Sequence, residues 1–562
     1  MSGGQSTSSV VIGIIDDGIA FANDCFRLAD GTTRVQFFWN QNQNIPGATP
    51  PSLPLWNYGH EIDKNTIDAN LVASFFPPPD GPVDEAKMYR LCKLVDYAVG
   101  QHKAAGWRIA HGTHTLSLAA GYPMSDNRRD RPIIAVQLPV ASTAEQSGAN
   151  LLPYVKDAVH YILDRALSLT GAGQQPLPVV INFSYAVHDG PHDGTSLLER
   201  MFDETIAQAI TQHEQYVQIV LPAGNTLQAR CHAKKAFGGL ADIQFLLRVQ
   251  PDGLRATEVS VWLPYRGPLP PTASQVTLTL TEPDGSVSDP VTEMLGAVAT
   301  LPTTGSNPYA FAVYEFDPLG ARRGCFQITI NPTARLLRRS SPSIAPSGLW
   351  TISLHRTGLP QQDPIEAWVQ RDDLLYGYPR RGRQAYFDDP CYLRYDKQGR
   401  PLYDDPPPPT VANPSYVERN GMINGIGTGR SPVVAGGFVA KTLQADTFST
   451  GGPCGGPYGG PRTEDSPDLL MPSDDSRVHN GILAAGSRSG SVVALSGTSM
   501  SCAQLTRLCA DRIAGGTFPN HATVQAAASV PPGGPERPPV RSGAGCTTPP
   551  TPTNGWKMRY WS

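Results

Sequence analysis

Two short segments place an acid and a pair of histidines beside apolar runs. Asp16 ends the run SVVIGIID, although Asp-Gly after a strand is most often only a turn. His111 and His114 stand three residues apart in His-Gly-Thr-His, just before the apolar stretch TLSLAAG. Two histidines at this spacing could bind a metal ion, whereas ordinary core or surface histidines are more common. Neither segment establishes a site by itself.

Two further segments offer a carboxamide and a hydroxyl. Asn225 ends the apolar run VQIVLPAGN, which taken alone is a strand terminus. Ser499 lies in Ser-Gly-Thr-Ser-Met-Ser at the start of an expected helix, where serine is most often an N-cap. Thr498 and Ser501 could provide that cap, which leaves the Ser499 hydroxyl for another role. A serine hydroxyl becomes a nucleophile when a neighbouring base removes its proton.

Taken together and in this order, the four segments resemble the subtilisin-like serine proteases, the S8 peptidases. The family motifs are D-[ST]-G, H-G-T-H, a strand ending in G-N, and G-T-S-M-[AS]. The resemblance covers roughly residues 9–225 and 420–515. It implies a catalytic triad in which Ser499 is the nucleophile, His111 the general base, and Asp16 the acid that holds the imidazole tautomer.

The resemblance also implies an oxyanion hole and a substrate-binding strand. The side-chain N–H of Asn225 and the backbone N–H of Ser499 would donate to the oxyanion. The segment INFSYA, residues 181–186, is similar to the family strand V-I-N-x-S-x-G, along which an extended peptide pairs by backbone hydrogen bonds. One wall of the P1 pocket would then be lined by Ser184, Tyr185 and Ala186, and the other by Pro222, Ala223 and Gly224.

Several positions depart from the family pattern. Ala503 stands where a proline is usual after the serine motif, Ala186 where the substrate strand has glycine, and Pro222 where a small residue is usual. None of these changes removes a catalytic group, so we expect them to affect specificity. Asp17 replaces the usual Ser or Thr, and its carboxylate either points inward beside His111 or faces solvent. We expect His114 to pack beside the site without a catalytic role.

The elements that must position these residues alternate between strand and helix. Apolar runs at 9–16, 178–185 and 217–225 predict buried parallel strands. Residues 151–168 and 196–214 have the apolar spacing of amphipathic helices, and a further helix should begin near Ser499. Helices are also expected near residues 60–73 and over 84–104. This alternation predicts an α/β fold, a subtilisin-like doubly wound parallel sheet with helices on both faces.

A different pattern begins after residue 236. Seven short strands separated by Pro, Gly and Asp turns predict an all-β sandwich. Its segment 348–352, GLWTI, is similar to the GxWxL strand of jelly-roll domains in proprotein convertases. The predicted organisation is a first catalytic segment 1–229, an inserted β-sandwich 230–380, an irregular connection 381–420, a second catalytic segment 421–515 with the nucleophile, and a Pro/Gly-rich tail 516–562.

Composition excludes several other classes of protein. Hydrophobic residues are 40% of the chain and charged residues 17%, which excludes a disordered chain, a coiled coil and a collagen. The net charge of −4, without a basic block, argues against a nucleic-acid partner. No apolar run of 18 residues and no signal peptide is present, so we expect a cytoplasmic protein with no membrane partner. Nine scattered cysteines without a C-x-x-C pair predict neither a disulfide framework nor a zinc site.

These observations predict a serine endopeptidase that acts on protein or peptide substrates through an acyl-enzyme. We expect no cofactor; structural calcium is common in the family, but the sequence does not locate its ligands. The first strand begins about seven residues into the chain, so we expect folding without a propeptide and restraint by the insert, the tail or a partner. The inserted β domain is either a spacer or stabiliser, or the part that selects substrates or docks a regulatory partner. The alternatives are a catalytically silent or latent peptide-binding relic, and an acyl transferase or peptide ligase.

Overall fold

The computed structural model describes residues 9–547 with internal gaps. All statements below concern these described residues. The gaps are 44, 53–54, 79–80, 95–108, 144–147, 149, 171–174, 266, 268–269, 305–306, 317–322, 336–342, 373–382, 406–413, 453–466, 477 and 534–537. The last residues of the predicted tail, 548–562, also lie outside the described part.

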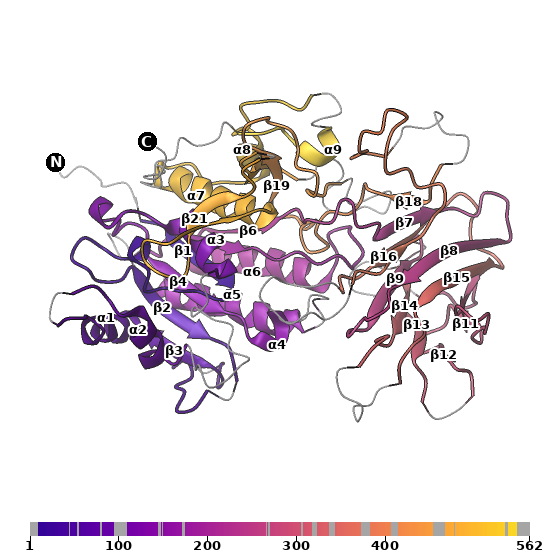
Figure 1. Ribbon diagram of the computed structural model, residues 1–562, viewed down its shortest axis with the longest axis horizontal. Coiled ribbons are helices and arrows are strands. Elements are labelled where there is room, and N and C mark those ends of the chain that lie inside the picture. The colour runs from indigo at the N-terminus through magenta and orange to yellow at the C-terminus, as the bar shows by residue number, and fades with distance from the viewer. Residues whose placement is uncertain are drawn as a thin grey trace.

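Eight strands form the sheet at the centre of the α/β part (Figure 1). They are β1 (Val11–Asp16), β2 (Val35–Asn40), β3 (His60–Asp63), β4 (Ile133–Gln137), β5 (Val179–Phe183), β6 (Val217–Pro222), β19 (Val433–Val439) and β20 (Leu469–Asp474). Their order is β20-β19-β6-β5-β1-β4-β2-β3, and every neighbouring pair is parallel except β2 with β3. The central strands are fully buried and rich in Val and Ile, as expected when both faces of a sheet are covered.

Helices cover both faces of this sheet, which confirms the predicted doubly wound architecture. On one face lie α3 (His111–Ala120) and α7 (Thr498–Ala514), and on the other lie α5 (Leu151–Leu167) and α6 (Leu197–His213). Successive residues of β1 point alternately into the two resulting cores, because side chains along a strand alternate between faces. The remaining helices are η1 (Asp24–Phe26), α1 (Lys64–Ala73), α2 (Glu85–Leu91), η2 (Met124–Asp126), α4 (Val140–Thr143), α8 (His521–Gln525) and α9 (Pro539–Ser542).

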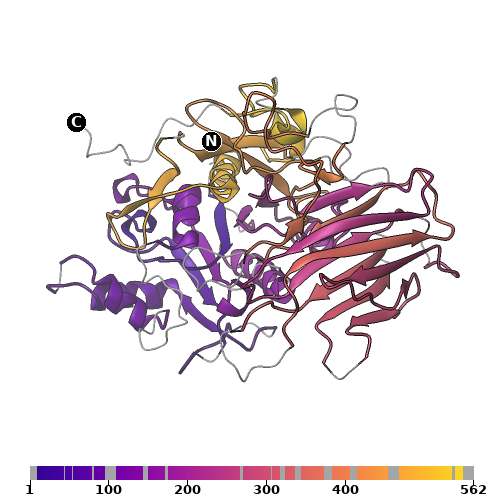
Figure 2. The same ribbon diagram turned by 45° about the vertical axis from the view of Figure 1, so that its right-hand side comes forward.

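Two antiparallel sheets occupy residues 232–418 and share one hydrophobic core (Figure 2). The five-stranded sheet has the order β11-β10-β15-β8-β17, with β8 (Asp242–Val249), β10 (Val276–Thr281), β11 (Val291–Thr292), β15 (Gly348–Arg356) and β17 (Tyr386–Phe387). The seven-stranded sheet has the order β12-β13-β14-β9-β16-β7-β18, with β7 (His232–Lys235), β9 (Thr257–Trp262), β12 (Val298–Leu301), β13 (Ala310–Phe316), β14 (Gly324–Ile330), β16 (Ile365–Val369) and β18 (Val417–Glu418). We call these residues the β block.

The β block is an insertion between two neighbouring strands of the large sheet. The chain leaves that sheet after β6 and returns in β19, and these two strands are paired in parallel. All seven predicted strands are present. The segment 381–420, expected as an irregular connection, adds β17 and β18 to the two sheets. Strands of two residues are too short to show alternation, so the sequence pattern does not reveal them.

Part of the predicted tail packs onto the α/β part instead of extending away from it. The side chain of Arg541 is 2% exposed, and Cys546 is buried in a small cluster with Phe438 and Leu470.

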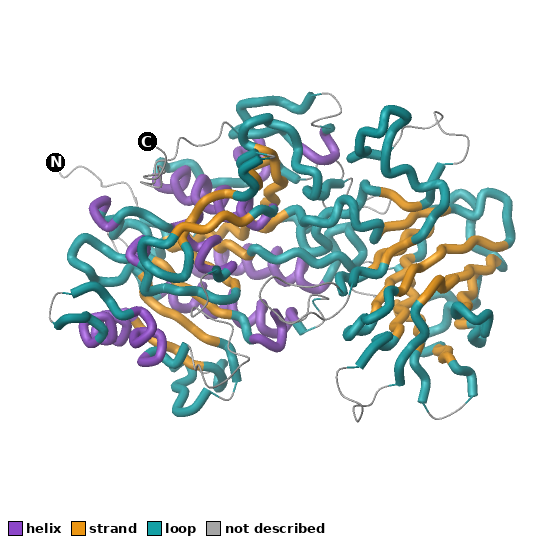
Figure 3. The backbone as a smooth tube through the Cα atoms, viewed as in Figure 1, coloured by secondary structure: helices purple, strands orange, loops and turns teal. Residues whose placement is uncertain are grey.

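A hairpin of β21 (Ile482–Ala485) and β22 (Val492–Leu495) precedes α7. Figure 3 shows the purple helices gathered around the α/β sheet and the orange strands of the β block to one side.

The described residues bear on the predictions made for the cysteines and for membrane-spanning helices. The eight cysteines that the structure describes are all free thiols, and Cys454 lies outside those residues. No helix in the described ranges has the length and apolar character needed to cross a membrane.

Candidate active site

The three predicted triad residues and the predicted oxyanion donor line one cavity of about 400 Å³. Asp16 ends β1, His111 begins α3, Asn225 follows β6 by three residues, and Ser499 is the second residue of α7. Carboxyl ends of parallel strands meet at one edge of a sheet, and there the loops and helix N-termini bring distant residues together. The topology therefore places an acid, an imidazole, a carboxamide and a hydroxyl around one space.

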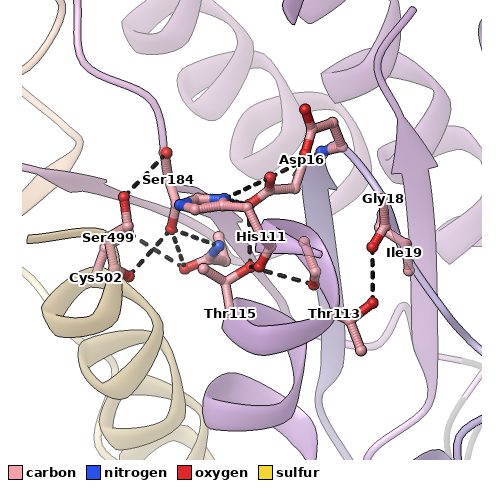
Figure 4. Close-up of polar contacts among 12 residues, drawn as sticks. Asp16, Gly18, Ile19, His111, Thr113, Thr115, Ser184, Ser499 and Cys502 are labelled. Atoms are coloured by element: carbon pink, nitrogen blue, oxygen red, sulfur yellow. Dashed lines mark hydrogen bonds and ion pairs between the residues drawn. The ribbon is translucent and has the colours of Figure 1, made fainter. Parts of the chain in front are cut away.

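Asp16 and His111 form a hydrogen-bonded pair (Figure 4). The Nδ1 atom of His111 lies 2.8 Å from Oδ1 and 3.0 Å from Oδ2 of Asp16. The Asp16 carboxylate also accepts from the backbone N–H of Asp17 at 2.8 Å and from Oγ1 of Thr115 at 3.0 Å. A carboxylate only accepts hydrogen bonds, so Nδ1 carries the proton and Nε2 is the unprotonated nitrogen of the ring.

A close approach between α3 and β1 makes this pair possible. The backbone N–H of Gly112 donates to the carbonyl of Asp17 at 2.7 Å. A Cβ atom at Gly112 would lie 2.3 Å from that carbonyl oxygen and 3.0 Å from the Cβ of Asp16. Backbone atoms cannot move aside cheaply, so only glycine lets the start of α3 dock against the end of β1.

Ser499 lies at the N-terminus of α7. In Figure 4 its side chain lies on the side of the His111 ring opposite Asp16. Its Oγ atom donates a long hydrogen bond of 3.4 Å to the carbonyl of Ser184. The first N–H groups of a helix have no partner within the helix, and the helix dipole makes this end positive. The backbone N–H of Ser499 is therefore suited to stabilise negative charge.

The carboxamide of Asn225 is held in one orientation by Thr498. Its Oδ1 atom accepts from the backbone N–H and from Oγ1 of Thr498, both at 2.9 Å. The Thr498 hydroxyl in turn accepts from the backbone N–H of Gly224 at 3.1 Å. Gly497 has a φ of +144°, and a Cβ atom there would lie 3.1 Å from Nδ2 of Asn225. Glycine thus leaves the amide nitrogen uncovered and able to donate to an oxyanion.

If the chain carries out the predicted peptide hydrolysis with Asn225 as an oxyanion donor, we expect Asn225→Ala to lower kcat by about 10²–10³, the loss measured when one oxyanion donor is removed from subtilisin. KM should change much less, because the donor acts on charge that develops in the transition state. The measurement is steady-state hydrolysis of one peptide by both chains. Asn307→Ala, an exposed position in the β block, serves as the control. A fall in kcat of less than threefold would contradict the assigned role.

The predicted substrate wall is only partly as expected. Ser184, Tyr185, Ala186 and Pro222 line the cavity, whereas Ala223 is fully buried and neither it nor Gly224 is among the lining residues. The backbone N–H and C=O of Ala186 form no hydrogen bond within the described part of the chain. These groups can therefore pair with an extended peptide.

Sequence reasoning missed Asn424, which joins the two walls. Its Nδ2 atom donates to the carbonyls of Tyr185 and Pro222, both at 3.0 Å, and its Oδ1 accepts from the backbone N–H of Val187 at 3.0 Å. Asn424 lies in a loop of the second catalytic segment, and no local pattern marks it. His188 and Arg371 also line the cavity and were not predicted.

His114 has the structural role that was expected. Its Nε2 atom lies 2.9 Å from the carbonyl of Ile482, and burial lowers the pKa of His114 to about 4. Asp17 lines the cavity beside Asp16. Across the described residues, no group of three or more His, Cys, Asp and Glu side chains is placed to hold a metal ion.

Comparison with known proteins adds information about the fold. The sequence matches no protein-family model and no curated protein. The structure is similar to the CspB protease of Clostridium perfringens, with a TM-score of 0.64 at 17% identity over 96% of this chain and 93% of that one. A cold-adapted subtilisin-like serine proteinase matches with a TM-score of 0.32 at 10% identity, over 96% of this chain and 89% of that one. The PatG macrocyclase matches with a TM-score of 0.33 at 12% identity, over 97% and 90%. The last two TM-scores are too low to support an argument. The similarity to the CspB protease agrees with the sheet order and with the helices on both faces, and together these observations show that the chain has the subtilisin-like fold.

Proposed function

We propose that this protein is a serine endopeptidase that hydrolyses peptide bonds through an Asp16–His111–Ser499 triad. The observation that carries the proposal is the hydrogen-bonded Asp16–His111 pair in the same cavity as Ser499 and Asn225. Structural relics that only bind peptides have no need of this set, since each member acts only in the covalent reaction.

The geometry supports a two-step mechanism. The Nε2 atom of His111 takes the hydroxyl proton of Ser499 as Oγ attacks the substrate carbonyl carbon. The resulting oxyanion accepts from Asn225 and from the backbone N–H of Ser499. His111 then gives its proton to the leaving amine, and the C–N bond breaks to leave an ester on Ser499. A water molecule then attacks the ester carbonyl carbon while His111 takes a proton from it. The bond between the acyl carbon and Oγ of Ser499 breaks, His111 returns the proton to Oγ, and the peptide acid is released. The proposed mechanism uses no cofactor.

Labelling with a fluorophosphonate, read by intact mass, tests this proposal. We expect one adduct per chain, because an activated serine displaces fluoride from phosphorus. The adduct should be absent in Ser499→Ala and present in Ser501→Ala. Ser501 is a matched control on the same helix, since its buried hydroxyl donates to the carbonyl of Met471 at 3.0 Å.

Two outcomes would contradict the proposal. An unlabelled wild-type chain would favour the peptide-binding relic. An adduct that persists in Ser499→Ala would place the nucleophile elsewhere. An acyl transferase or ligase forms the same adduct, so a separate, unlabelled sample of the chain must also release both peptide products in water without an added amine.

A further inference from the structure

The helix α9, near the C-terminal end of the described chain, packs against a loop that runs from Asp446 to Gly452. The side chain of Arg541 on α9 is 2% exposed. Its Nη2 atom donates to the carbonyl of Asp446, and its Nε atom donates to that of Ser449 at 3.4 Å. The backbone N–H of Gly452 donates to the carbonyl of Val540 at 2.8 Å. The helix α9 therefore binds both ends of this loop, which we call the 446–452 loop.

The packing between α9 and the 446–452 loop requires a glycine at position 451. A Cβ atom at Gly451 would lie 2.1 Å from the carbonyl oxygen of Val540 and 2.8 Å from the Cα atom of Arg541. Both are backbone atoms, which could give way only if α9 moved. Just after α9, the carbonyl of Gly545 accepts from the backbone N–H of Leu470 in β20 at 2.8 Å. The C-terminal segment is therefore fixed both at α9 and just after it.

The 446–452 loop also holds the chain on both sides of Asn225. The backbone N–H of Thr450 donates to the carbonyl of Gly224 at 3.1 Å, and its hydroxyl donates to the carbonyl one residue earlier. The carbonyl of Phe448 accepts from the backbone N–H of Leu227 at 3.2 Å. Contacts with one loop therefore position the backbone before and after the oxyanion donor.

The backbone position of Asn225 decides whether its Nδ2 atom can reach an oxyanion. An oxyanion donor is effective at about 2.7–3.1 Å, and a hydrogen bond weakens when its length or angle departs from the ideal. The contacts with Thr498 set the rotation of the carboxamide. They do not fix the backbone at Gly224 and Leu227, which the 446–452 loop contacts.

The charge of Arg541 matters because the carbonyls that it binds belong to buried residues. Asp446 is 3% exposed, and Ser449 is fully buried. A buried carbonyl that loses a donor favours a conformation in which it finds another partner or reaches water. Loss of the guanidinium should therefore shift the 446–452 loop, and the backbone around Asn225 should move with it.

We propose that Arg541 is a positioning residue for the oxyanion donor and acts on Asn225 through the 446–452 loop. This inference rests on the proposed function and deepens it. It gives the C-terminal segment a supporting role, whereas restraint by the tail is one expectation from the sequence. The two roles predict opposite signs, because loss of a support lowers kcat and loss of a restraint raises it.

Steady-state peptide hydrolysis by Arg541→Met tests this role, since methionine keeps an apolar stem and removes the donors. We expect kcat to fall about 10- to 100-fold, as when a distant change misplaces a group at the reacting centre. KM should stay within about twofold, because the oxyanion donor acts on the transition state. Arg541→Lys keeps a cation that can reach one of the carbonyls, so its loss of kcat should be smaller.

Arg34→Met is the matched control for loss of a buried arginine. The side chain of Arg34 is also 2% exposed, and it donates to the carbonyls of Cys25 at 2.8 Å and Arg131 at 3.1 Å. Arg34 directly precedes β2, at the amino ends of the parallel strands and so at the edge of the sheet opposite the cavity. Arg34→Met should lower the urea midpoint while the folded chain keeps the kcat of the wild type.

A double-mutant cycle shows whether the effect of Arg541 passes through Asn225. In the Asn225→Ala background, Arg541→Met should lower kcat by less than about twofold, because the donor that it positions is already absent. A general loosening of the fold would instead multiply the two losses. If Arg541→Met does not fold, Arg541→Lys in both backgrounds gives the same comparison. Fully multiplicative losses, or an unchanged or raised kcat in the single variant, would overturn the inference.

The rate of fluorophosphonate labelling separates this inference from the proposed function. The phosphoryl oxygen of the reagent gains negative charge as Oγ of Ser499 bonds to phosphorus and fluoride leaves, so the rate depends on the oxyanion donors even in a slow hydrolase. A labelled wild type with an equal rate in Arg541→Met would overturn the role of Arg541 alone. A wild-type chain that resists the reagent would overturn both.

Discussion

Replacing His111 by alanine should lower kcat for peptide hydrolysis by about a million-fold, the loss measured for the equivalent change in subtilisin-like proteases. The reason lies in the contact between His111 Nδ1 and Asp16 Oδ1 at 2.8 Å, which leaves Nε2 unprotonated as the proposed base for Ser499. Without this base the Ser499 hydroxyl keeps its proton at neutral pH. Because the His111 side chain is 37% exposed, its loss should not disturb the fold.

The measurement for His111→Ala is single-turnover cleavage of the peptide that the wild type cleaves fastest, with the rate of fluorophosphonate labelling in parallel. His355→Ala is a matched control. The Nδ1 atom of His355 lies 2.7 Å from Oδ1 of Asp242, so it forms a similar His–Asp pair on the surface of the β block. We expect full activity in His355→Ala. Activity in His111→Ala within tenfold of the wild type would exclude His111 as the base.

Asp16→Asn should lower kcat by about 10⁴, the loss seen when the carboxylate of a Ser-His-Asp triad becomes an amide. The Asp16 carboxylate accepts from three donors, on His111, Thr115 and the backbone of Asp17. In Asp16→Asn one of the two side-chain oxygens becomes an N–H₂ group, which is a hydrogen-bond donor. When this group faces His111, Nδ1 must be the unprotonated acceptor, and the ring proton lies on Nε2. Nε2 then has no lone pair with which to take the proton of Ser499.

Two readouts distinguish this tautomer effect from unfolding. The urea midpoint of Asp16→Asn should remain close to that of the wild type, since the packing volume is unchanged. Its kcat should fall while KM for the same peptide stays similar, because the carboxylate does not touch the substrate. Asp242→Asn changes the surface pair in the same way and should leave kcat unaltered. An equal loss of kcat in both variants would argue against a specific role for Asp16.

Much of the fold follows from local sequence patterns. The strands β1, β5 and β6 are short apolar runs. The helices α5 and α6 have apolar residues at helical spacing, and α7 begins with polar residues directly after Gly497. Both patterns can be recognised in a sequence, because a buried parallel strand requires a continuous apolar run and an amphipathic helix requires apolar residues at helical spacing.

The sequence is less informative where a local rule competes with tertiary pairing. Residues 60–73 were expected as one helix, but residues 60–63 pair with β2 as an edge strand. The helix begins at Lys64, where the side chain of Asp63 caps it by accepting from the backbone N–H of Thr66. The helix predicted over 84–104 forms only from Glu85 to Leu91 and is capped at Cys92, and residues 95–108 lie outside the described part.

The sequence alone determined the residue types for the proposed chemistry, because Asp16, His111, Asn225 and Ser499 each lie in a short motif with its own turn and glycine. It did not determine Asn424, His188 or Arg371. His188 lies in the loop after β5, Arg371 follows β16 inside the β block, and Asn424 lies in the loop between β18 and β19. Asn424 joins the two cavity walls because β6 and β19, which flank the inserted β block in sequence, pair with each other. His188 and Arg371 line the cavity because β16 packs against the loop after β5. Contacts between segments far apart in the chain leave no periodic trace, so only the tertiary structure decides what surrounds the reacting groups.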